Sequence, residues 1–206
     1  MTGTAARSGE PSGKRAQVLD AAQACFVRQG FHRASMNDIA REAAMSAANL
    51  YRYFDSKEAL IAGLVEREGE RGAALATSLG DGGDGRAQLL GIVERYFLAV
   101  DRDEAVMRVE IWAEASRNPA IAAVVKGSEA AADAWFLDMF ARLATSPDCE
   151  PPALLVAVAP LLRGAVVAIA TLPDYDPAPV VAHVRALLDA GLAGRLPTAE
   201  VVKGRR

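Results

Sequence analysis

Cysteine and histidine are scarce in this chain of 206 residues, which has two of each. Cys25 and Cys149 lie far apart and form no CxxC pair, so a disulfide framework is not expected. Neither His32 nor His183 belongs to a His/Cys/Asp/Glu cluster with metal-ligand spacing, and no G-x-S-x-G nucleophile elbow occurs. We therefore expect no metal ion, no cofactor and no enzymatic activity.

Long unbroken apolar segments are missing as well. The N-terminal residues, MTGTAARSGEPSGKR, lack the apolar region of a signal peptide. No segment approaches the roughly 18 unbroken apolar residues of a membrane span. Cys25 falls on the apolar face of the first predicted helix, which favours a small buried core residue over a reactive thiol. These features predict a cytoplasmic protein in a reducing compartment, with no membrane partner.

Aromatic residues make up only 6% of the chain, although 51% of its residues are hydrophobic and alanine is abundant. Because alanine favours helices whereas aromatic residues favour strands, we expect an all-α protein. The net charge of −3 is unevenly spread, since residues 1–57 carry +3 and the remainder carries −6. A basic N-terminal segment suits binding to phosphate. The acidic remainder argues against an architectural DNA-binding protein, which would be basic throughout.

The composition divides the chain into a polar tail at 1–12 that is expected to be disordered, two helical segments at 13–60 and 61–195, and a polar tail at 196–206. The motif and the family resemblance described below assign the first helical segment to a helix-turn-helix DNA-binding domain and the second to a regulatory and dimerisation domain. Helical spacing of apolar residues predicts the helices at about 14–29, 86–100, 104–116, 119–145, 153–171 and 179–192. Residues 80–85, GDGGDG, match G-x-G-x-x-G but follow a helical segment and not a strand. A flexible link is therefore favoured over a dinucleotide-binding loop.

Residues 35–54 contain two short helical patterns with a break of about three residues between them. Ser35 and Asp38 form a capping box for the first. Ser46 caps the second, AANLYRYF, whose inward face carries Leu50 and Phe54. This spacing is typical of a helix-turn-helix, although a plain pair of packed helices is about equally common.

Specific residues decide between these two interpretations. They are Ala21, Ala22, Phe26, Gly30 and Phe31, then Ser35, Ile39-Ala40, Ser46, the run Leu50-Tyr51-Arg52-Tyr53-Phe54, and Lys57-Glu58-Ala59-Leu60. In this order and spacing, the segment from about Lys14 to Leu64 resembles the DNA-binding domain of the TetR family of transcriptional regulators. The chain departs from the family at Ala44 and Ala48, where glycine is frequent.

The resemblance implies that this segment contacts double-stranded DNA through nine residues. Those expected mainly at phosphates are Tyr51, Tyr53 and Lys57, with Ser35 and Asn49 in support, and those expected at base edges are Asn37, Ala47, Ala48 and Arg52. Lys57 also falls in the first turn of a helix that we expect Asp55 to cap and to run to about Ser78. A lysine beside exposed backbone N–H groups suits a DNA phosphate.

The helices predicted at 153–171 and 179–192 carry more apolar residues than one chain of this size can cover. A two-fold homodimer would bury the remaining apolar residues by packing these two helices and those of the partner into a four-helix bundle. The family resemblance implies the same interface. The residues expected at the dimer interface are Leu155, Val158, Leu162, Val166, Val184, Leu187 and Leu188.

A second group of large apolar residues suits either a helical core or a ligand cavity. Its members are Phe97, Met107, Ile111, Trp112, Trp135, Phe136 and Met139, with Arg108, Glu110, Glu114 and Arg163 as candidate polar groups that orient a ligand. Because TetR regulators bind small inducers in this domain, the resemblance implies that some of these residues bind the inducer. The segment RVEIWAEASRNP at 108–119 also resembles, over a short stretch, the choline-responsive repressors of betaine synthesis.

Together these features predict a ligand-responsive transcriptional regulator, more specifically a repressor that binds a palindromic operator as a dimer and is released by a small-molecule inducer. The alternative is a small-molecule carrier or an enzyme on a helical scaffold. The sequence identifies neither the inducer nor the operator and target genes, and it leaves repression and activation both open.

Overall fold

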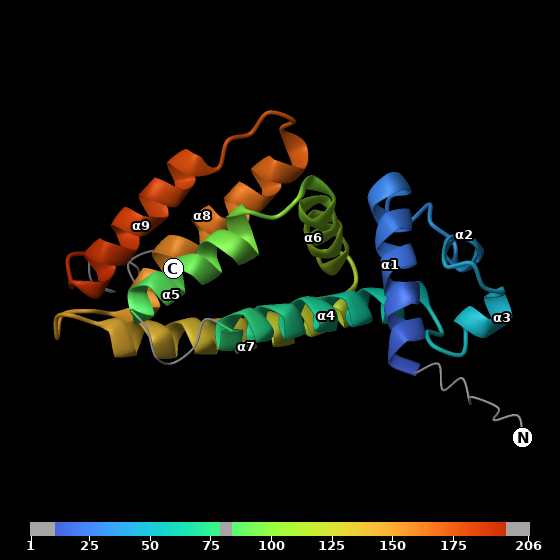
Figure 1. Ribbon diagram of the computed structural model, residues 1–206, viewed down its shortest axis with the longest axis horizontal. Helices are drawn as coiled ribbons and strands as arrows, with labels where there is room; N and C mark the ends of the chain where they lie inside the picture. Colours follow the sequence, from blue (N-terminus) through green and yellow to red (C-terminus); the bar gives the residue numbers. More distant parts are fainter. Residues whose placement is uncertain (1–10, 79–83, 197–206) are drawn as a thin grey trace, which may run out of the picture. The chain divides into compact units, whose positions relative to one another are not determined.

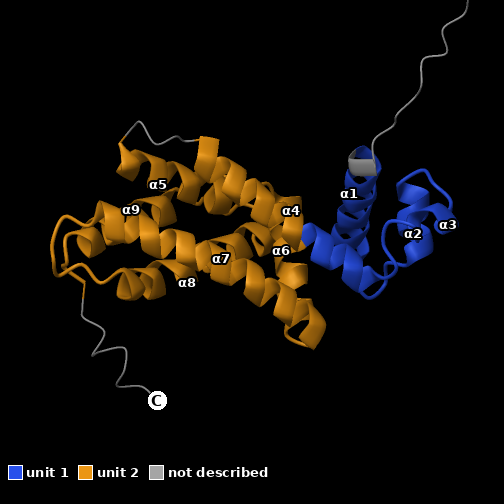
Figure 2. Ribbon diagram, turned by 90° about the horizontal axis from the view of Figure 1, so that it is seen from below, with its two compact units in different colours: residues 1–64 blue, residues 65–206 orange. Residues whose placement is uncertain are grey.

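The computed structural model describes residues 11–78 and 84–196, and all regular elements in these ranges are helices (Figure 1). The prediction of an all-α protein is confirmed. Two compact units divide between Leu64 and Val65, slightly beyond the boundary expected after residue 60 (Figure 2). The predicted tails at 1–12 and 196–206 fall almost entirely outside the described residues.

Unit 1 is a small helical module built around the first helix. Its elements are α1 (Pro11–Gln29), α2 (Met36–Glu42), α3 (Ala47–Leu50) and the beginning of α4 (Lys57–Ser78). The inward side of α1 is completely buried at Val18, Ala22 and Phe26, and Cys25 is buried beside them as expected. The helix ends at Gly30, whose φ of +80° is readily adopted only by a residue without a Cβ.

The start of α4 differs by one residue from the prediction. Ser56, and not Asp55, supplies the cap, since its Oγ accepts a hydrogen bond from the backbone N–H of Ala59 at 3.1 Å. The end of the helix at Ser78 agrees with the sequence. α4 is one continuous helix that begins in unit 1 and continues into unit 2.

Unit 2 contains the rest of α4 and the helices that follow it. These are α5 (Gly85–Val93), a π-helix η1 (Glu94–Leu98), α6 (Arg102–Ala115), α7 (Pro119–Leu143), α8 (Pro151–Thr171) and α9 (Ala178–Leu192). Side-chain caps fix three of the helix starts, with Asp84, Asp101 and Asn118 accepting from backbone N–H groups of α5, α6 and α7. The one helix expected over 86–100 is thus interrupted by the π-helix.

The GDGGDG segment connects two helices, because α4 ends before it and Gly85 already belongs to α5. Gly80 and Gly82 lie outside the described residues. A dinucleotide-binding loop would follow a strand, whereas the described element before this segment is a helix, and the flexible link stays a prediction.

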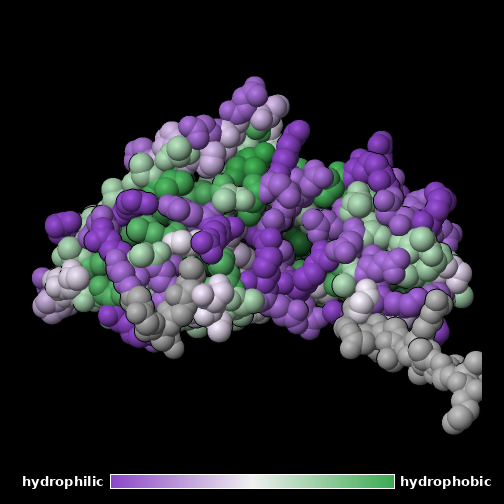
Figure 3. Space-filling model, in the orientation of Figure 1, coloured by the Kyte–Doolittle hydropathy of each residue, from purple (hydrophilic) through white to green (hydrophobic). Residues whose placement is uncertain are grey.

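The core of unit 2 forms where α8 packs against its neighbours. One buried cluster joins α5, α7, α8 and α9, and a smaller one joins α6 to α8. α8 has the length and composition of a membrane-spanning helix, which is also typical of a core helix in a globular protein. Its inner side is buried at Leu154, Val158 and Leu162, whereas Val156, Leu161 and Val167 are exposed. Figure 3 shows hydrophobic surface, in green, on the part of unit 2 where α9 lies in Figure 1.

Candidate functional site

The predicted helix-turn-helix is present in unit 1 and its first cap is as expected. The Ser35 Oγ accepts from the Asp38 N–H at 3.1 Å, and the Asp38 carboxylate accepts from the Ser35 hydroxyl at 2.6 Å and from its N–H at 3.1 Å. These hydrogen bonds lower the pKa of Asp38 below its usual range, because they favour the ionised carboxylate. At the other end of α2, Gln17 of α1 donates to the backbone oxygen of Ala43 at 2.9 Å, which ties α2 to α1.

The turn after α2 is a Schellman motif with alanine in the position that glycine usually occupies. Ala44 has a φ of +51°, in the left-handed region. Its N–H donates to the Arg41 oxygen at 3.1 Å, and the Met45 N–H donates to the Ala40 oxygen at 2.9 Å, the two bonds that define the motif. The departure from glycine at residue 44 is therefore a point of backbone strain.

The second helix of the motif is shorter than predicted. Ser46 caps it by accepting from the Asn49 N–H at 3.2 Å, but α3 ends at Leu50. The N–H groups of Arg52 and Tyr53 donate three residues back, so the chain tightens into a turn before Phe54. The expected helix over AANLYRYF is wrong in its second half, although Leu50 and Phe54 are buried as predicted.

The nine predicted DNA-contacting residues differ in their accessibility. Exposed residues are Ser35, Asn37, Ala48, Tyr51 and Arg52, and half-buried residues are Ala47, Asn49, Tyr53 and Lys57. Tyr51 is 52% exposed although its side chain is large and aromatic, and it follows directly on the buried Leu50. Apart from Lys57, all of them lie on α2, on α3 or immediately beside these two helices.

Lys57 has a structural role that the sequence did not indicate. Its ammonium donates to the backbone oxygens of Phe31 at 2.6 Å and His32 at 3.3 Å, and it lies 4.4 Å from the centre of the Phe31 ring. Two of its three N–H donors therefore fix the turn between α1 and α2. The expected contact with phosphate stays a prediction, for which one donor remains.

Unit 2 contains a pocket with a cavity volume of about 160 Å³ between α4, η1, α6, α7 and α8. Four of the seven predicted ligand-contacting residues line it, namely Phe97, Ile111, Trp112 and Phe136. A cavity of about 150 Å³ is large enough for benzene, so the space suits a small or partly enclosed ligand. Its wall is mostly apolar, with a few polar groups, as is usual for ligand sites.

The other three residues predicted to contact the ligand lie elsewhere in unit 2, and their contact with a ligand stays a prediction. Met107 and Met139 are each only 4% exposed and belong to the core, while Trp135 packs edge-on against Phe136 with ring centres 5.0 Å apart. None of the three lines the pocket, since helical periodicity identifies an apolar face but not which neighbour covers it. Among the candidate polar residues, Arg108 and Arg163 reach the wall.

Several residues that line the pocket were not predicted from the sequence, and the π-helix explains one of them, Tyr96. Ala99 donates to the Glu94 oxygen five residues back at 2.7 Å, which widens the last turn of this segment. Tyr96 and Phe97 then both line the pocket, their rings in an edge-to-face contact at 4.9 Å. The other polar residues missed by sequence reasoning are Glu68, Ser128, Glu129 and Asp133.

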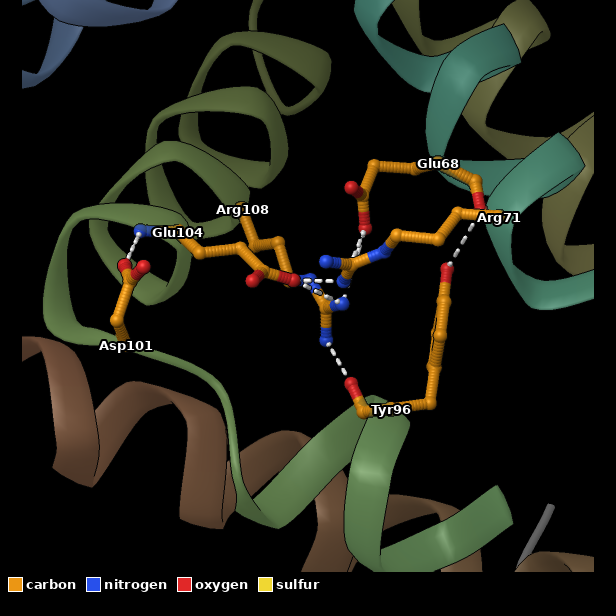
Figure 4. A network of polar contacts seen from close by, with 6 residues as sticks. All are labelled: Glu68, Arg71, Tyr96, Asp101, Glu104 and Arg108. Atoms are coloured by element: carbon orange, nitrogen blue, oxygen red, sulfur yellow. Dashed lines mark hydrogen bonds and ion pairs between the residues drawn. The ribbon is translucent and has the colours of Figure 1, made fainter. Parts of the chain in front are cut away.

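A buried arginine dominates the polar wall of the pocket (Figure 4). Arg108 is 7% exposed and donates to the Tyr96 backbone oxygen at 2.6 Å, to Glu68 at 2.9 Å and to Glu104 at 2.9 Å. Arg71 also pairs with Glu68, at 3.3 Å, and with Glu104. Burial raises the pKa of the Tyr96 phenol, partly opposed by Arg108 and Arg71. Each buried charge here has a partner of opposite sign.

The second arginine of the wall lies at a more open position. Arg163 pairs with Glu129 at 2.6 Å, and its guanidinium lies 5.1 Å from the centre of the Trp112 ring. Within the described ranges, no three His, Cys, Asp or Glu residues lie close enough together to hold a metal ion.

The residues predicted at the dimer interface are mostly covered within a single chain, and their contact with a partner stays a prediction. Val158, Leu162, Val166, Val184 and Leu188 are at most 3% exposed within a single chain, and Leu155 and Leu187 pack against the same core. Their side chains join α8 and α9 to each other and to the rest of unit 2, although Leu155 and Leu187 are only partly buried. The large hydrophobic residues of α8 that remain exposed are Val156, Leu161 and Val167, and the exposed Leu172 follows directly after the helix.

Comparison with known proteins identifies both parts of the chain. Residues 18–64 match the family model described as "Bacterial regulatory proteins, tetR family", and residues 85–193 match "BetI-type transcriptional repressor, C-terminal". The chain is 33% identical to the HTH-type transcriptional regulator UidR of Escherichia coli over 115 residues, 54% of this chain and 57% of UidR. It is 34% identical to the HTH-type transcriptional activator FasR of Mycolicibacterium smegmatis over 136 residues, 63% of this chain and 59% of FasR.

These alignments therefore span less than two thirds of the curated relatives. The solved structure of Salmonella enterica GusR superimposes with a TM-score of 0.74 at 25% identity, over 91% of this chain and 98% of GusR.

Proposed function

Because the chain belongs to the TetR family of bacterial regulatory proteins, we propose that it is a ligand-responsive transcriptional regulator that binds an operator as a homodimer. The observation that carries the proposal is the joining of two sites by one helix. A capped helix-turn-helix lies in unit 1, a mostly apolar pocket lies in unit 2, and α4 is continuous from one unit into the other.

The helix-turn-helix binds the major groove of double-stranded DNA, with α3 and the turn that follows it in contact with the operator. Arg52 and Asn37 contact base edges, where arginine favours guanine and asparagine favours adenine. The exposed Tyr51 contacts phosphate together with Tyr53 and the remaining donor of Lys57. Ala47 and Ala48 allow close approach, and Ser35 and Asn49 support the contacts from the two helix starts.

The homodimer forms through the outward sides of α8 and α9. Val156, Leu161, Val167 and Leu172 are 39–56% exposed, which is costly for branched apolar side chains unless a partner covers them. A two-fold axis through this surface would set the separation of the two helix-turn-helix units and match a palindromic operator.

The pocket in unit 2 binds a small-molecule inducer, which contacts Phe97, Ile111, Trp112 and Phe136. Inducer binding favours a dimer geometry with lower operator affinity, so the protein acts as a repressor. The description of the C-terminal family as a repressor supports this direction, although FasR is named an activator. A regulator of this kind acts on chromosomal DNA and is cytoplasmic.

The direct test is selection of bound fragments from genomic DNA by the full-length protein, followed by measurement of affinity for the selected fragment and for single-base variants. We expect Arg52→Ala to remove the preference at one base pair per half-site, at a cost of about 1–3 kcal/mol. Arg41→Ala is the matched control, because Arg41 is an exposed arginine of α2 outside the predicted contact set. Absence of any selected sequence would refute DNA recognition.

The dimer surface is tested separately by sedimentation. Val156→Glu places a charge on the exposed side of α8 and is expected to yield monomers that no longer bind the selected fragment tightly. Val124→Glu is the control, since Val124 is an exposed valine on α7, 37% exposed against 56% for Val156. If Val156→Glu stays dimeric, the interface lies elsewhere.

A further inference from the structure

We propose that four alternating charges, which we call the charge ring, transmit occupation of the pocket to α4. The charge ring consists of Glu68 and Arg71 on α4 and of Glu104 and Arg108 on α6 (Figure 4). This inference rests on the proposed function, because it assigns a means of control to the proposed ligand pocket.

The charge ring is closed, since each member pairs with both neighbours of opposite sign. Two pairs cross between the helices, Arg108 with Glu68 at 2.9 Å and Arg71 with Glu104. Two pairs run along a helix, Arg71 with Glu68 at 3.3 Å and Arg108 with Glu104 at 2.9 Å. Displacement of α4 relative to α6 must therefore stretch both crossing pairs together. Arg108, Glu104 and Glu68 have little access to water, whereas Arg71 is about half exposed, so the pairs made by Arg108 resist separation more strongly than an exposed ion pair does.

Tyr96 connects the charge ring to the π-helix. The Arg108 guanidinium lies 4.4 Å and that of Arg71 5.6 Å from the centre of the Tyr96 ring, and the Tyr96 hydroxyl donates to the backbone oxygen of Glu68 at 3.4 Å. The Tyr96 ring also lies against Gly72 of α4, where an added Cβ would come within 3.3 Å of it. Glycine at this position lets the aromatic ring contact the helix backbone directly.

The same residues form part of the pocket wall. Glu68, Tyr96 and Arg108 line the cavity, whereas Arg71 and Glu104 are not among its lining residues. A molecule that fills the cavity presses on one side of the charge ring, and the crossing pairs carry this displacement into α4. Because α4 continues into unit 1, a change in its order or position reaches the helix-turn-helix through the chain itself.

The experiment replaces the unidentified inducer by a side chain of the protein. Ala159 lines the pocket and is half-buried, so Ala159→Phe fills the cavity from within. Ala157→Phe is the control, because Ala157 is a half-buried alanine of the same helix outside the pocket lining. Both are made in the parent chain and in the double variant Arg71→Gln/Glu104→Gln, which removes one crossing pair without leaving an uncompensated buried charge.

Hydrogen exchange of the α4 amides at residues 65–78 is the readout in all variants. We expect Ala159→Phe to accelerate exchange by about fivefold or more in the parent chain, a usual size for coupling between sites. The acceleration should shrink to less than about twofold in the Arg71→Gln/Glu104→Gln background. Ala157→Phe should leave the exchange rates of the α4 amides unchanged in the parent chain and in the double variant. Equal acceleration in the two backgrounds, or none in the parent, overturns the proposal.

The second double variant, Glu68→Gln/Arg108→Met, removes the other crossing pair and should abolish the effect in the same way. Affinity for the selected DNA fragment is measured in parallel and separates the two proposals. If the double variants abolish the acceleration of exchange in α4 but no DNA sequence is selected, only the proposed function is refuted. If DNA binding is specific but Ala159→Phe does not accelerate exchange in the parent chain, or accelerates it equally in the double variants, only the role of the charge ring is refuted.

Discussion

Ala44→Gly should stabilise unit 1, because the parent residue holds a backbone conformation that glycine adopts without strain. Ala44 ends α2 as the left-handed residue of a Schellman motif, with a φ of +51°. It is the only non-glycine residue with positive φ in the described parts of the chain. Because Ala44 is exposed, removal of its methyl group loses little packing.

Two opposing contributions set the magnitude. The left-handed conformation costs an L-residue about 1–2 kcal/mol, which glycine recovers. Glycine also makes the unfolded chain more flexible, which lowers stability by about 0.4–1 kcal/mol. With both contributions taken at mid-range, the difference is a net gain of about 0.8 kcal/mol in the free energy of unfolding of unit 1.

Hydrogen exchange of amides in residues 36–54 is the appropriate assay, because both tryptophans, Trp112 and Trp135, lie in unit 2 and do not report on unit 1. The expected gain slows exchange by about two- to fivefold. Ala48→Gly is the matched control, since Ala48 is an exposed alanine inside α3 and glycine there should accelerate exchange. Unchanged or faster exchange in Ala44→Gly would refute the argument from strain.

Three further results follow from the geometry of single side chains. Lys57→Met should destabilise unit 1 by about 1.5–3 kcal/mol in a thermal melt, because two hydrogen bonds from a charged group are lost; a change within about 0.5 kcal/mol would make Lys57 an ordinary surface lysine. The lowered pKa of Asp38 predicts a stabilising contribution that is complete above about pH 4 and is lost as the pH falls through the folded pKa. In Asp38→Asn, the free energy of unfolding of unit 1 should therefore fall less steeply as the pH drops below about 4. A pH dependence equal to that of the parent chain would contradict this. Burial raises the pKa of both cysteine thiols, and Cys25 is fully covered, so iodoacetamide should modify Cys149 first and Cys25 only on unfolding.

The helix-turn-helix was predictable because its signals are local. A cap, a helical turn and the next cap depend on residues three or four positions apart, and the caps at Ser35 and Ser46 form as expected. The errors near this motif are also local. Ser56 and Asp55 are both good capping residues, so composition does not choose between them. The early end of α3 has no local signal, because no glycine or proline follows Leu50 within this segment.

The pocket and the dimer surface were less predictable, because periodicity identifies an apolar face without its neighbours. Met139 and Phe136 belong to the same apolar stretch of α7, yet Phe136 lines the pocket and Met139 does not. On α8 the large residues chosen for the interface are those that the core of one chain already buries. The apolar residues left outside are the better guide to a partner.

Residues near each other in the chain were enough to establish helices, their caps and the identity of the DNA-binding module, since the free energy of a capped turn depends on its own few residues. Packing between distant segments established the rest. Lys57 meets the turn after α1 across 26 positions, and Arg108 meets Glu68 across 40. Such contacts depend on where the whole chain places two side chains, and no short stretch of sequence contains that information.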